Sequence, residues 1–165
     1  MKTLYLIRHA KSSWAEVGMK DFDRSLEERG LKDAPKMAKL LRDMSVQPDY
    51  MVSSPAKRAF TTAQYFALGL DFPIDKIEKE MEIYEAEEAA LLHIVRELPD
   101  DKKTILMFGH NPGFTYFANR FAKKNIENVP TCGIVVIELT GGKWKDFNEK
   151  TATVKDFLYP KSLND

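Results

Sequence analysis

The chain has 165 residues, of which 44% are hydrophobic and 30% charged, with 25 Lys and Arg against 25 Asp and Glu. This length fits a single domain spanning 1–165, and the composition allows a buried core, which excludes a disordered protein. The zero net charge argues against a protein that holds nucleic acid or an anionic membrane through bulk charge, although it permits a local positive pocket.

The chain contains one cysteine, Cys132, which rules out a disulfide within the chain. We expect Cys132 to be a small buried hydrophobe in or beside a strand. The apolar run at 4–7 is too short for a signal peptide, and no stretch approaches the roughly 18 apolar residues that a membrane helix needs. The expectation is therefore a soluble cytoplasmic protein.

Apolar runs typical of strands alternate with amphipathic segments typical of helices. In its first half the chain predicts a strand over 3–7, a polar loop over 11–24, a helix after Ser25, a strand over 50–52, a helix over 54–68 and a loop with a possible short strand over 71–77. The second half predicts a helix over 87–98, a strand over 104–108, a turn over 109–112, a helix to about 123, and a hairpin of 133–139 with 143–147 around Gly141-Gly142, with 154–158 a possible further strand. This order indicates a three-layer α/β/α domain with helices on both faces of a mixed, mostly parallel sheet.

Local signals predict where two of these helices begin. Ser25 precedes Glu28 in the spacing of a capping box, which marks a helix start. Pro35 then requires either a kink in that helix or a separate turn over 25–30. In the next helix, Ser54 is expected as the N-cap, because a proline follows it at the first helical position.

Chemically competent side chains follow three of the predicted strands. Arg8 and His9 come directly after the strand over 3–7, and Arg58 lies in the first turn of the helix that follows the strand over 50–52. His110 lies in the 109–113 segment, directly after the strand over 104–108. In open α/β sheets, ligands bind at the carboxyl ends of the strands. If these strands are parallel and adjacent, two arginines and two histidines meet in one pocket.

Two arginines and two histidines together favour phosphate chemistry. A guanidinium matches phosphoryl oxygens with two parallel hydrogen bonds, and a helix N-terminus adds a favourable field for an anion. A neutral imidazole is a competent nucleophile when its other nitrogen is held by a hydrogen bond. The sequence has no Walker loop, EF-hand or HExxH motif and no obvious carboxylate cluster for Mg²⁺, so we expect no cofactor and no metal.

Three ordered motifs carry a resemblance to a known family. These motifs are LIRHAKSSW over 6–14, SSPAKRAFTTA over 53–63 and GHNPG over 109–113. The chain resembles the histidine phosphatase superfamily and, within it, the small SixA-type phosphohistidine phosphatases. The form RHAKSSW and the segment DFDRSLEERGLKDAP over 21–35 favour that branch over the phosphoglycerate mutases.

The resemblance implies a phosphoglycerate-mutase-like α/β/α fold and a two-step reaction that needs no metal. His9 matches the nucleophile that accepts the phosphoryl group, which water then removes. Arg8, Arg58 and His110 match the groups around the phosphoryl oxygens, where such catalysis is mostly achieved.

The acid that protonates the leaving group in many superfamily members has several candidates here. They lie in EMEIYEAEEAA over 80–90, as Glu82, Glu85, Glu87 and Glu88, and we choose Glu85. The alternative is that these acids form a solvated helix start. A strong acid matters less for a phosphohistidine substrate, because the imidazole that leaves has a conjugate-acid pKa of roughly 6.5.

The short segments between motifs leave little chain for a lid, so we expect an open pocket suited to a side chain that protrudes from a protein. The expected partner is a histidine-phosphotransfer domain or another phosphohistidine protein. The alternatives are a small-molecule phosphomonoesterase and a phosphoryl-binding module without turnover. Trp14, Tyr84 and Phe114 either rim the pocket or pack elsewhere, and His93 is expected to be structural or exposed.

Overall fold

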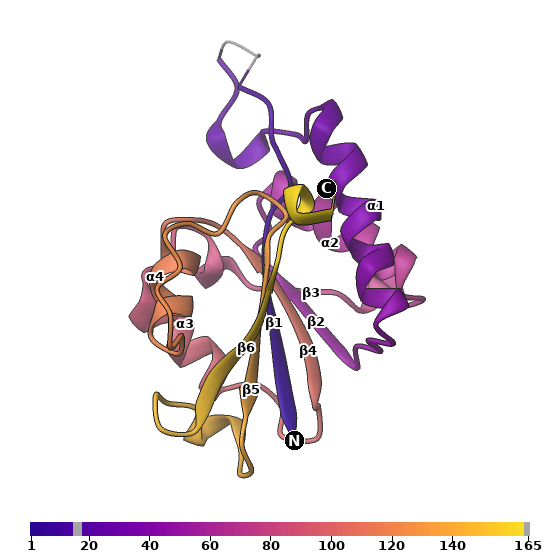
Figure 1. Ribbon diagram of the computed structural model, residues 1–165. Helices are drawn as coiled ribbons and strands as arrows, with labels where there is room; N and C mark the ends of the chain where they lie inside the picture. The colour runs from indigo at the N-terminus through magenta and orange to yellow at the C-terminus, as the bar shows by residue number, and fades with distance from the viewer. Residues whose placement is uncertain (15–17, 164–165) are drawn as a thin grey trace.

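The computed structural model describes residues 1–14 and 18–163, and a six-stranded sheet runs through it (Figure 1). The order of the strands in space is β3-β2-β4-β1-β5-β6. The first four of these are mutually parallel, whereas β5 is antiparallel to β1 and β6 to β5, which confirms the predicted mixed sheet. The strands are β1 (Lys2–Arg8), β2 (Tyr50–Ser53), β3 (Glu78–Lys79), β4 (Thr104–Gly109), β5 (Ile134–Leu139) and β6 (Ala152–Leu158).

Helices cover both faces of this sheet (Figure 1). On one face lie α1 (Glu28–Asp43) and α2 (Lys57–Gly69), which bury Met37 and Phe66 against β1, β2 and β4. On the other lie α3 (Glu88–Arg96) and α4 (Gly113–Asn119), which pack around Phe117 in a second core. Successive side chains of a strand point to opposite faces, so β1 supplies Leu6 to the second core and Ile7 to the first.

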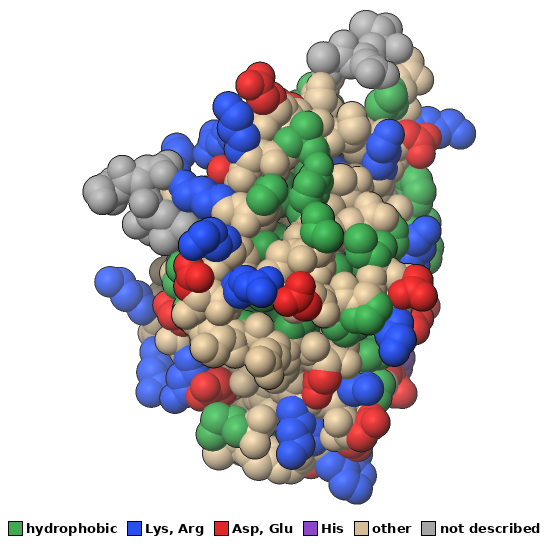
Figure 2. All heavy atoms as spheres, turned by 90° about the vertical axis from the view of Figure 1, so that its right-hand side faces the viewer, with side chains coloured by type: hydrophobic (Ala, Val, Ile, Leu, Met, Phe, Trp, Pro, Cys, Tyr) green, Lys and Arg blue, Asp and Glu red, His purple; other side chains and the backbone are tan. Residues whose placement is uncertain are grey.

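Figure 2 shows the face that α1 and α2 present to solvent. A band of apolar side chains runs down this face between side chains of both charges. The exposed apolar residues of these two helices include Leu31 on α1 and Leu68 on α2, which is 66% exposed.

The parallel strands β2, β4 and β1 are neighbours, and their carboxyl ends lie in register. Arg8 pairs with Gly109, and Ser53 pairs with Phe108. The residues that follow these strands therefore leave the same edge of the sheet side by side, which is the condition on which the predicted pocket depends.

The start of α1 differs from the prediction. The helix begins at Glu28, and Ser25 lies outside it without capping it, so the predicted capping box is wrong. The carbonyl of Ser25 instead accepts a hydrogen bond from the Ser13 backbone, which ties the helix entry to the loop after β1. The separate turn over 25–30 is also wrong, because α1 includes Gly30 and continues through Pro35.

The start of α2 also differs. The N-cap is Ala56, not Ser54, and the helix begins at Lys57. The hydroxyl of Ser54 accepts a hydrogen bond from the Ala56 backbone at 3.2 Å, so it supports the turn before the helix rather than the helix itself.

The predicted hairpin partner over 143–147 is wrong. This stretch contains a short 3-10 helix, Trp144–Asp146, and β5 pairs instead with β6. The cause is Trp144, which is fully buried, donates its ring N–H to the Lys102 carbonyl at 2.9 Å and donates its backbone N–H to Asp100. Burying the indole takes this segment out of the plane of the sheet.

Other predictions are confirmed or only shortened. Cys132 is fully buried next to β5, as expected, and burial raises the pKa of its thiol. The α4 helix ends at Asn119 rather than near 123, and the short strand, β3, follows the 71–77 loop rather than lying inside it. Within residues 1–14 and 18–163, no helix has the length and apolar character needed to cross a membrane.

Candidate active site

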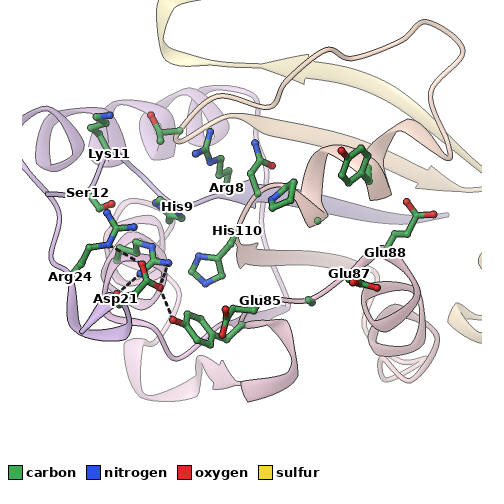
Figure 3. A pocket seen from close by; sticks show the side chains of 18 of the residues that line it. Arg8, His9, Lys11, Ser12, Asp21, Arg24, Glu85, Glu87, Glu88 and His110 are labelled. Carbon is green, nitrogen blue, oxygen red and sulfur yellow. Dashed lines mark hydrogen bonds and ion pairs between the residues drawn. The ribbon is translucent and has the colours of Figure 1, made fainter. Parts of the chain in front are cut away.

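An open pocket of about 880 Å³ lies at the carboxyl edge of the parallel strands (Figure 3). All four residues of the predicted constellation line it: Arg8, His9, Arg58 and His110. They come from the end of β1, the first turn of α2 and the turn after β4, so residues far apart in sequence meet as predicted.

His9 is held in one orientation and one tautomer. Its Nδ1 lies 2.7 Å from the carbonyl oxygen of Ala10, which can only accept, so Nδ1 carries the proton and Nε2 carries a lone pair. Its backbone N–H donates to the Gly109 carbonyl at 3.0 Å, which fixes the chain just past β1. Burial lowers the pKa of His9 to about 3, assisted by His110 and the two arginines, so the ring is neutral at pH 7.

His110 faces His9 across the pocket, with the ring centroids 5.2 Å apart. Its Nε2 lies 2.8 Å from the hydroxyl oxygen of Ser54, while its Nδ1 is buried and has no hydrogen-bond partner among the described residues. Burial, followed by the positive charge of Arg58, lowers the pKa of His110 to about 3. Both imidazoles are therefore neutral and buried, at 6% and 8% exposure.

Arg8 is anchored by the segment that precedes β5. Its Nη1 donates to the Val129 carbonyl oxygen at 3.0 Å, and its Nε is buried without a partner in the described part of the chain. Burial, and then the positive charge of Arg58, lower the pKa of Arg8.

Arg58 is 5% exposed and is oriented by Asp21. Its Nη1 donates to the Asp21 carbonyl oxygen at 2.7 Å and its Nη2 to the Asp21 carboxylate at 3.0 Å, leaving a buried Nε without a partner among the described residues. A guanidinium has five N–H donors, so Arg58 still has donors for an anion after it bonds Asp21.

Asp21 is a site residue that the sequence analysis did not single out. It also accepts hydrogen bonds from Arg24 Nε at 3.0 Å and from the Tyr84 hydroxyl at 2.6 Å. Burial opposes its ionisation, but the hydrogen bonds from Tyr84 and Arg58 prevail and lower the pKa of Asp21 to about 2. Since Asp21 lies in a 3-10 turn of a long loop, only tertiary structure brings it to the pocket.

Thr62 and Ser54 support the site from behind and were likewise not singled out as functional. The Thr62 hydroxyl accepts from the Ala10 backbone N–H at 3.0 Å and donates to the Arg58 carbonyl at 2.7 Å. One hydroxyl on α2 thus links the segment after β1, which carries His9, to the helix that carries Arg58. Ser54 provides the matching support for His110.

Glu85, our candidate proton donor, lines the pocket, is exposed and has a φ of 58°. Glu87 and Glu88 also line the pocket, whereas Glu82 does not. In Figure 3 Glu87 and Glu88 lie on the α3 side, away from His9 and the arginines. Glu87 and Glu88 therefore lie apart from the cationic groups around the two imidazoles.

The structure decides between the two alternatives left open for the aromatic residues, and the rim holds for Trp14 and Tyr84. Trp14 is 76% exposed and Tyr84 contacts His110 edge to face at 5.5 Å, and both line the pocket. The guanidinium carbon of Arg24 lies 3.5 Å from the Trp14 ring centroid, a cation–π stack at the pocket edge. For Phe114 the other alternative holds, because it is 1% exposed and packs in the core, and His93 is exposed, one of the two outcomes expected for it.

This arrangement can bind a phosphoryl group and attack it. The guanidinium groups of Arg8 and Arg58 supply positive charge and directed hydrogen-bond donors. The hydrogen bond at His9 Nδ1 holds the ring in place, so the lone pair on Nε2 has a fixed direction. Among the described residues, no group of three or more His, Cys, Asp or Glu side chains is arranged to hold a metal ion.

The family model for the histidine phosphatase superfamily (branch 1) matches residues 4–99. The chain belongs to this superfamily. An uncharacterised Mycobacterium tuberculosis protein is 28% identical, with 94% of this chain and 100% of that protein aligned. An uncharacterised chloroplastic protein of Arabidopsis thaliana is also 28% identical, over 88% of this chain and 70% of that protein.

Two solved structures that carry the name SixA share the fold. A SixA-type protein of Agrobacterium tumefaciens has 27% identity and a TM-score of 0.80, over 96% of this chain and 98% of that one. The protein histidine phosphatase SixA complexed with tungstate has 19% identity and a TM-score of 0.83, over 98% and 99%. The superfamily and the phosphoglycerate-mutase-like fold expected from the sequence are thus confirmed, and together they support a phosphatase.

Proposed function

We propose that this histidine phosphatase hydrolyses phosphohistidine on a protein, through a covalent phosphoryl intermediate on His9. The observation that carries the proposal is the neutral, oriented His9, whose Nε2 lone pair lies beside His110, Arg8 and Arg58 in one pocket. A module that only binds phosphoryl groups has no need of an aligned nucleophile beside its cationic clamp.

In the first step, His9 Nε2 attacks phosphorus in line with the bond to the substrate nitrogen. A new N–P bond forms to His9 as the substrate N–P bond breaks, and the electron pair of the broken bond goes to the departing imidazole, which takes up a proton. The Nδ1–H of His9 keeps its hydrogen bond to Ala10, which stabilises the positive charge that builds on the ring.

In the second step, water attacks the phosphorus of phospho-His9 from the side that the substrate imidazole has left. The N–P bond to His9 breaks, its electron pair returns to Nε2, and inorganic phosphate leaves with the oxygen of the water. His9 is thereby restored to its neutral state, ready for another cycle.

Arg8, Arg58 and His110 stabilise the charge on the equatorial oxygens in both steps. Because Asp21 and Val129 already hold the two guanidinium groups, little reorganisation is needed when the phosphoryl group arrives. Glu85 is the proposed proton donor from the rim, a role that a phosphohistidine substrate demands only weakly.

A protein substrate is favoured by the open pocket and by the SixA-like fold. The rim carries exposed aromatic groups, Trp14 and Tyr116, the latter 61% exposed, which suit contact with a protein surface. A histidine-phosphotransfer domain is the kind of partner that presents such a phosphorylated side chain.

The test compares wild type with His9→Ala on p-nitrophenyl phosphate and on a phosphorylated histidine-phosphotransfer domain, both in EDTA. We expect wild type to release phosphate from both substrates and His9→Ala to lose at least about 10³-fold in kcat, as triad nucleophile variants do. Full activity of His9→Ala would contradict the mechanism.

A small phosphomonoester is the second candidate substrate. It is favoured by a relative named phosphoserine phosphatase 1, from Hydrogenobacter thermophilus, with 32% identity over 61% of this chain and 49% of that protein. A panel of small phosphate esters separates the candidates. A preference for one ester by several decades in kcat/KM over the phosphoprotein would reverse the ranking.

A further inference from the structure

A second hollow, of about 770 Å³, lies beside the active-site pocket. It is bounded by the segment that follows α4, the end of β6 and the start of α1, which run close to one another near the C-terminus (Figure 1). We call it the basic groove, because five of its lining residues are cationic: Arg29, Lys123, Lys124, Lys155 and Lys161.

The charge of the groove is unbalanced, although the chain as a whole is neutral. Among the described residues two carboxylates line it, those of Glu127 and Asp156, while Arg29 and Lys155 form ion pairs with Asp33 and Glu138, which do not line the groove. Lys123 and Lys124 are exposed, and in the described part of the chain neither forms an ion pair. Unpaired lysines on one concave surface attract an anionic partner.

The groove also offers an apolar wall. Phe157 and Tyr159 both line it, with ring centroids 5.0 Å apart, and Pro130 and Pro160 complete this side. Cationic groups beside partly buried rings and prolines suit a polypeptide segment, which brings both charge and apolar contact, better than a free inorganic anion.

The groove and the active-site pocket share a wall. Thr131 lines both hollows, and the segment just before it is fixed to the catalytic groups. The Val129 carbonyl accepts from Arg8 at 3.0 Å and from the Asn111 side chain at 3.0 Å, and Asn111 also bonds Asn128, which lines the groove. A chain lying in the groove is therefore held at a defined place next to Arg8, Arg58 and His110, which we call the phosphoryl clamp.

The two sides of the catalytic pocket differ in charge. On the α3 side the rim carries Glu87 and Glu88, whereas across Thr131 the surface continues into the basic groove. Repulsion by the acidic rim and attraction by the groove act in the same direction, so an acidic segment is directed to one side only.

We propose that the basic groove binds an acidic segment of the protein substrate, next in sequence or space to its phosphorylated residue. This inference rests on the proposed protein phosphatase function and adds a determinant of substrate choice. The phosphoryl clamp recognises the phosphoryl group that is removed, and the groove determines which phosphorylated proteins bind as substrates.

The test uses synthetic peptides that carry one phosphohistidine, made with phosphoramidate, with acidic, neutral or basic flanking residues. Wild type is compared with Lys123→Glu/Lys124→Glu and with Lys76→Glu/Lys145→Glu, a control of equal charge change at exposed lysines outside both hollows. The readout is the ratio of kcat/KM for the acidic peptide to that for the neutral peptide.

We expect wild type and the control to prefer the acidic peptide by about tenfold at low salt, through KM rather than kcat, and to lose this preference as salt rises. The Lys123→Glu/Lys124→Glu variant should lose or invert the preference at every salt concentration. An identical ratio in all three proteins would overturn the proposal.

A binding measurement separates this proposal from the proposed function. Fluorescence anisotropy with the unphosphorylated acidic peptide should show binding that weakens about tenfold in Lys123→Glu/Lys124→Glu and not in the control. If the acidic peptide binds but no phosphohistidine peptide is hydrolysed, the proposed function is refuted and the proposal that the groove binds acidic segments is still supported. Tighter binding of a single-stranded oligonucleotide than of the acidic peptide would overturn the acidic-protein assignment.

Discussion

At the scale of single residues, the site depends on groups that orient the four predicted ones. The motifs identified Arg8, His9, Arg58 and His110, because each follows a strand at a place where α/β sheets bind ligands. No local pattern could identify Asp21, because a 3-10 turn in a loop reaches Arg58 only when the whole fold has formed.

Arg58→Lys tests the phosphoryl clamp. Lysine keeps the positive charge but loses the planar pair of donors that can hold Asp21 and a phosphoryl oxygen together. We expect kcat/KM for p-nitrophenyl phosphate to fall about 10²- to 10³-fold, the typical cost of removing one donor to transition-state charge. Steady-state kinetics measure this fall, and a loss below threefold would show that Arg58 contributes charge alone.

Ser54→Ala tests the support of His110. The change removes the hydroxyl that lies 2.8 Å from His110 Nε2 and that accepts from the Ala56 backbone. We expect about a tenfold lower kcat, since His110 loses its orientation, and about 1–2 kcal/mol less stability to urea unfolding. Ser53→Ala is the control, because in the described part of the chain the Ser53 hydroxyl bonds only the Ser54 carbonyl, so kcat should remain near that of wild type.

At the scale of elements, tertiary contacts override local signals at several places. The Gly141-Gly142 turn correctly marks the end of β5. Because Trp144 is buried in a 3-10 helix after this turn, the partner strand begins only at Ala152. Periodicity could not reveal this, because it reports a strand or helix and not where an indole is buried. Gly30 is a second example. Glycine is a poor helix former, yet α1 includes Gly30 at the place where the helix lies against the backbone of Lys11.

Gly30→Ala should destabilise the protein although alanine favours helices by about 1 kcal/mol. A Cβ at position 30 would meet the Lys11 carbonyl oxygen at 2.2 Å, which is backbone and cannot yield without moving the loop that follows His9. We expect about 1–3 kcal/mol of lost stability and reduced kcat, measured by urea unfolding and steady-state kinetics. Lys32→Ala, at an exposed position on the same helix, should change stability by less than about 0.5 kcal/mol, and equal effects of the two changes would contradict the contact.

At the scale of the whole molecule, two buried neutral histidines link the site to global stability. His9 and His110 have pKa values lowered to about 3, against about 6.5 in an unfolded chain. Between these values the unfolded state binds protons that the folded state does not. Stability is therefore fully present above about pH 6.5 and is lost as the pH falls toward 3.

Urea unfolding at pH 6 and pH 5 should show this loss. Each histidine contributes about 1.4 kcal/mol per pH unit at most, so His9→Gln and His110→Gln should each show a shallower pH dependence than wild type. The chain has three histidines, and His93 is exposed, which makes His93→Gln the matched control. A reduction in slope for His93→Gln equal to that for His9→Gln would contradict the burial of the His9 ring.

The overall charge balance has an uneven distribution that the sum conceals. Cations gather around the imidazoles and in the basic groove, while Glu87 and Glu88 lie on the α3 side of the pocket rim. The sequence predicted the positive pocket from its motifs. The groove could not be predicted, because its lysines come from segments that meet only in the folded chain.

The most direct test of the central claim is to trap the phosphoenzyme. Wild type mixed with excess phosphohistidine protein, quenched in alkali within the first turnover and digested, should yield a peptide that carries one phosphoryl group on His9, stable in alkali and labile in acid. His9→Ala should yield none, while Ser54→Ala should still yield it. A phosphoryl group on another residue, or turnover by wild type with no phosphoryl group on His9 at any time point, would contradict the account.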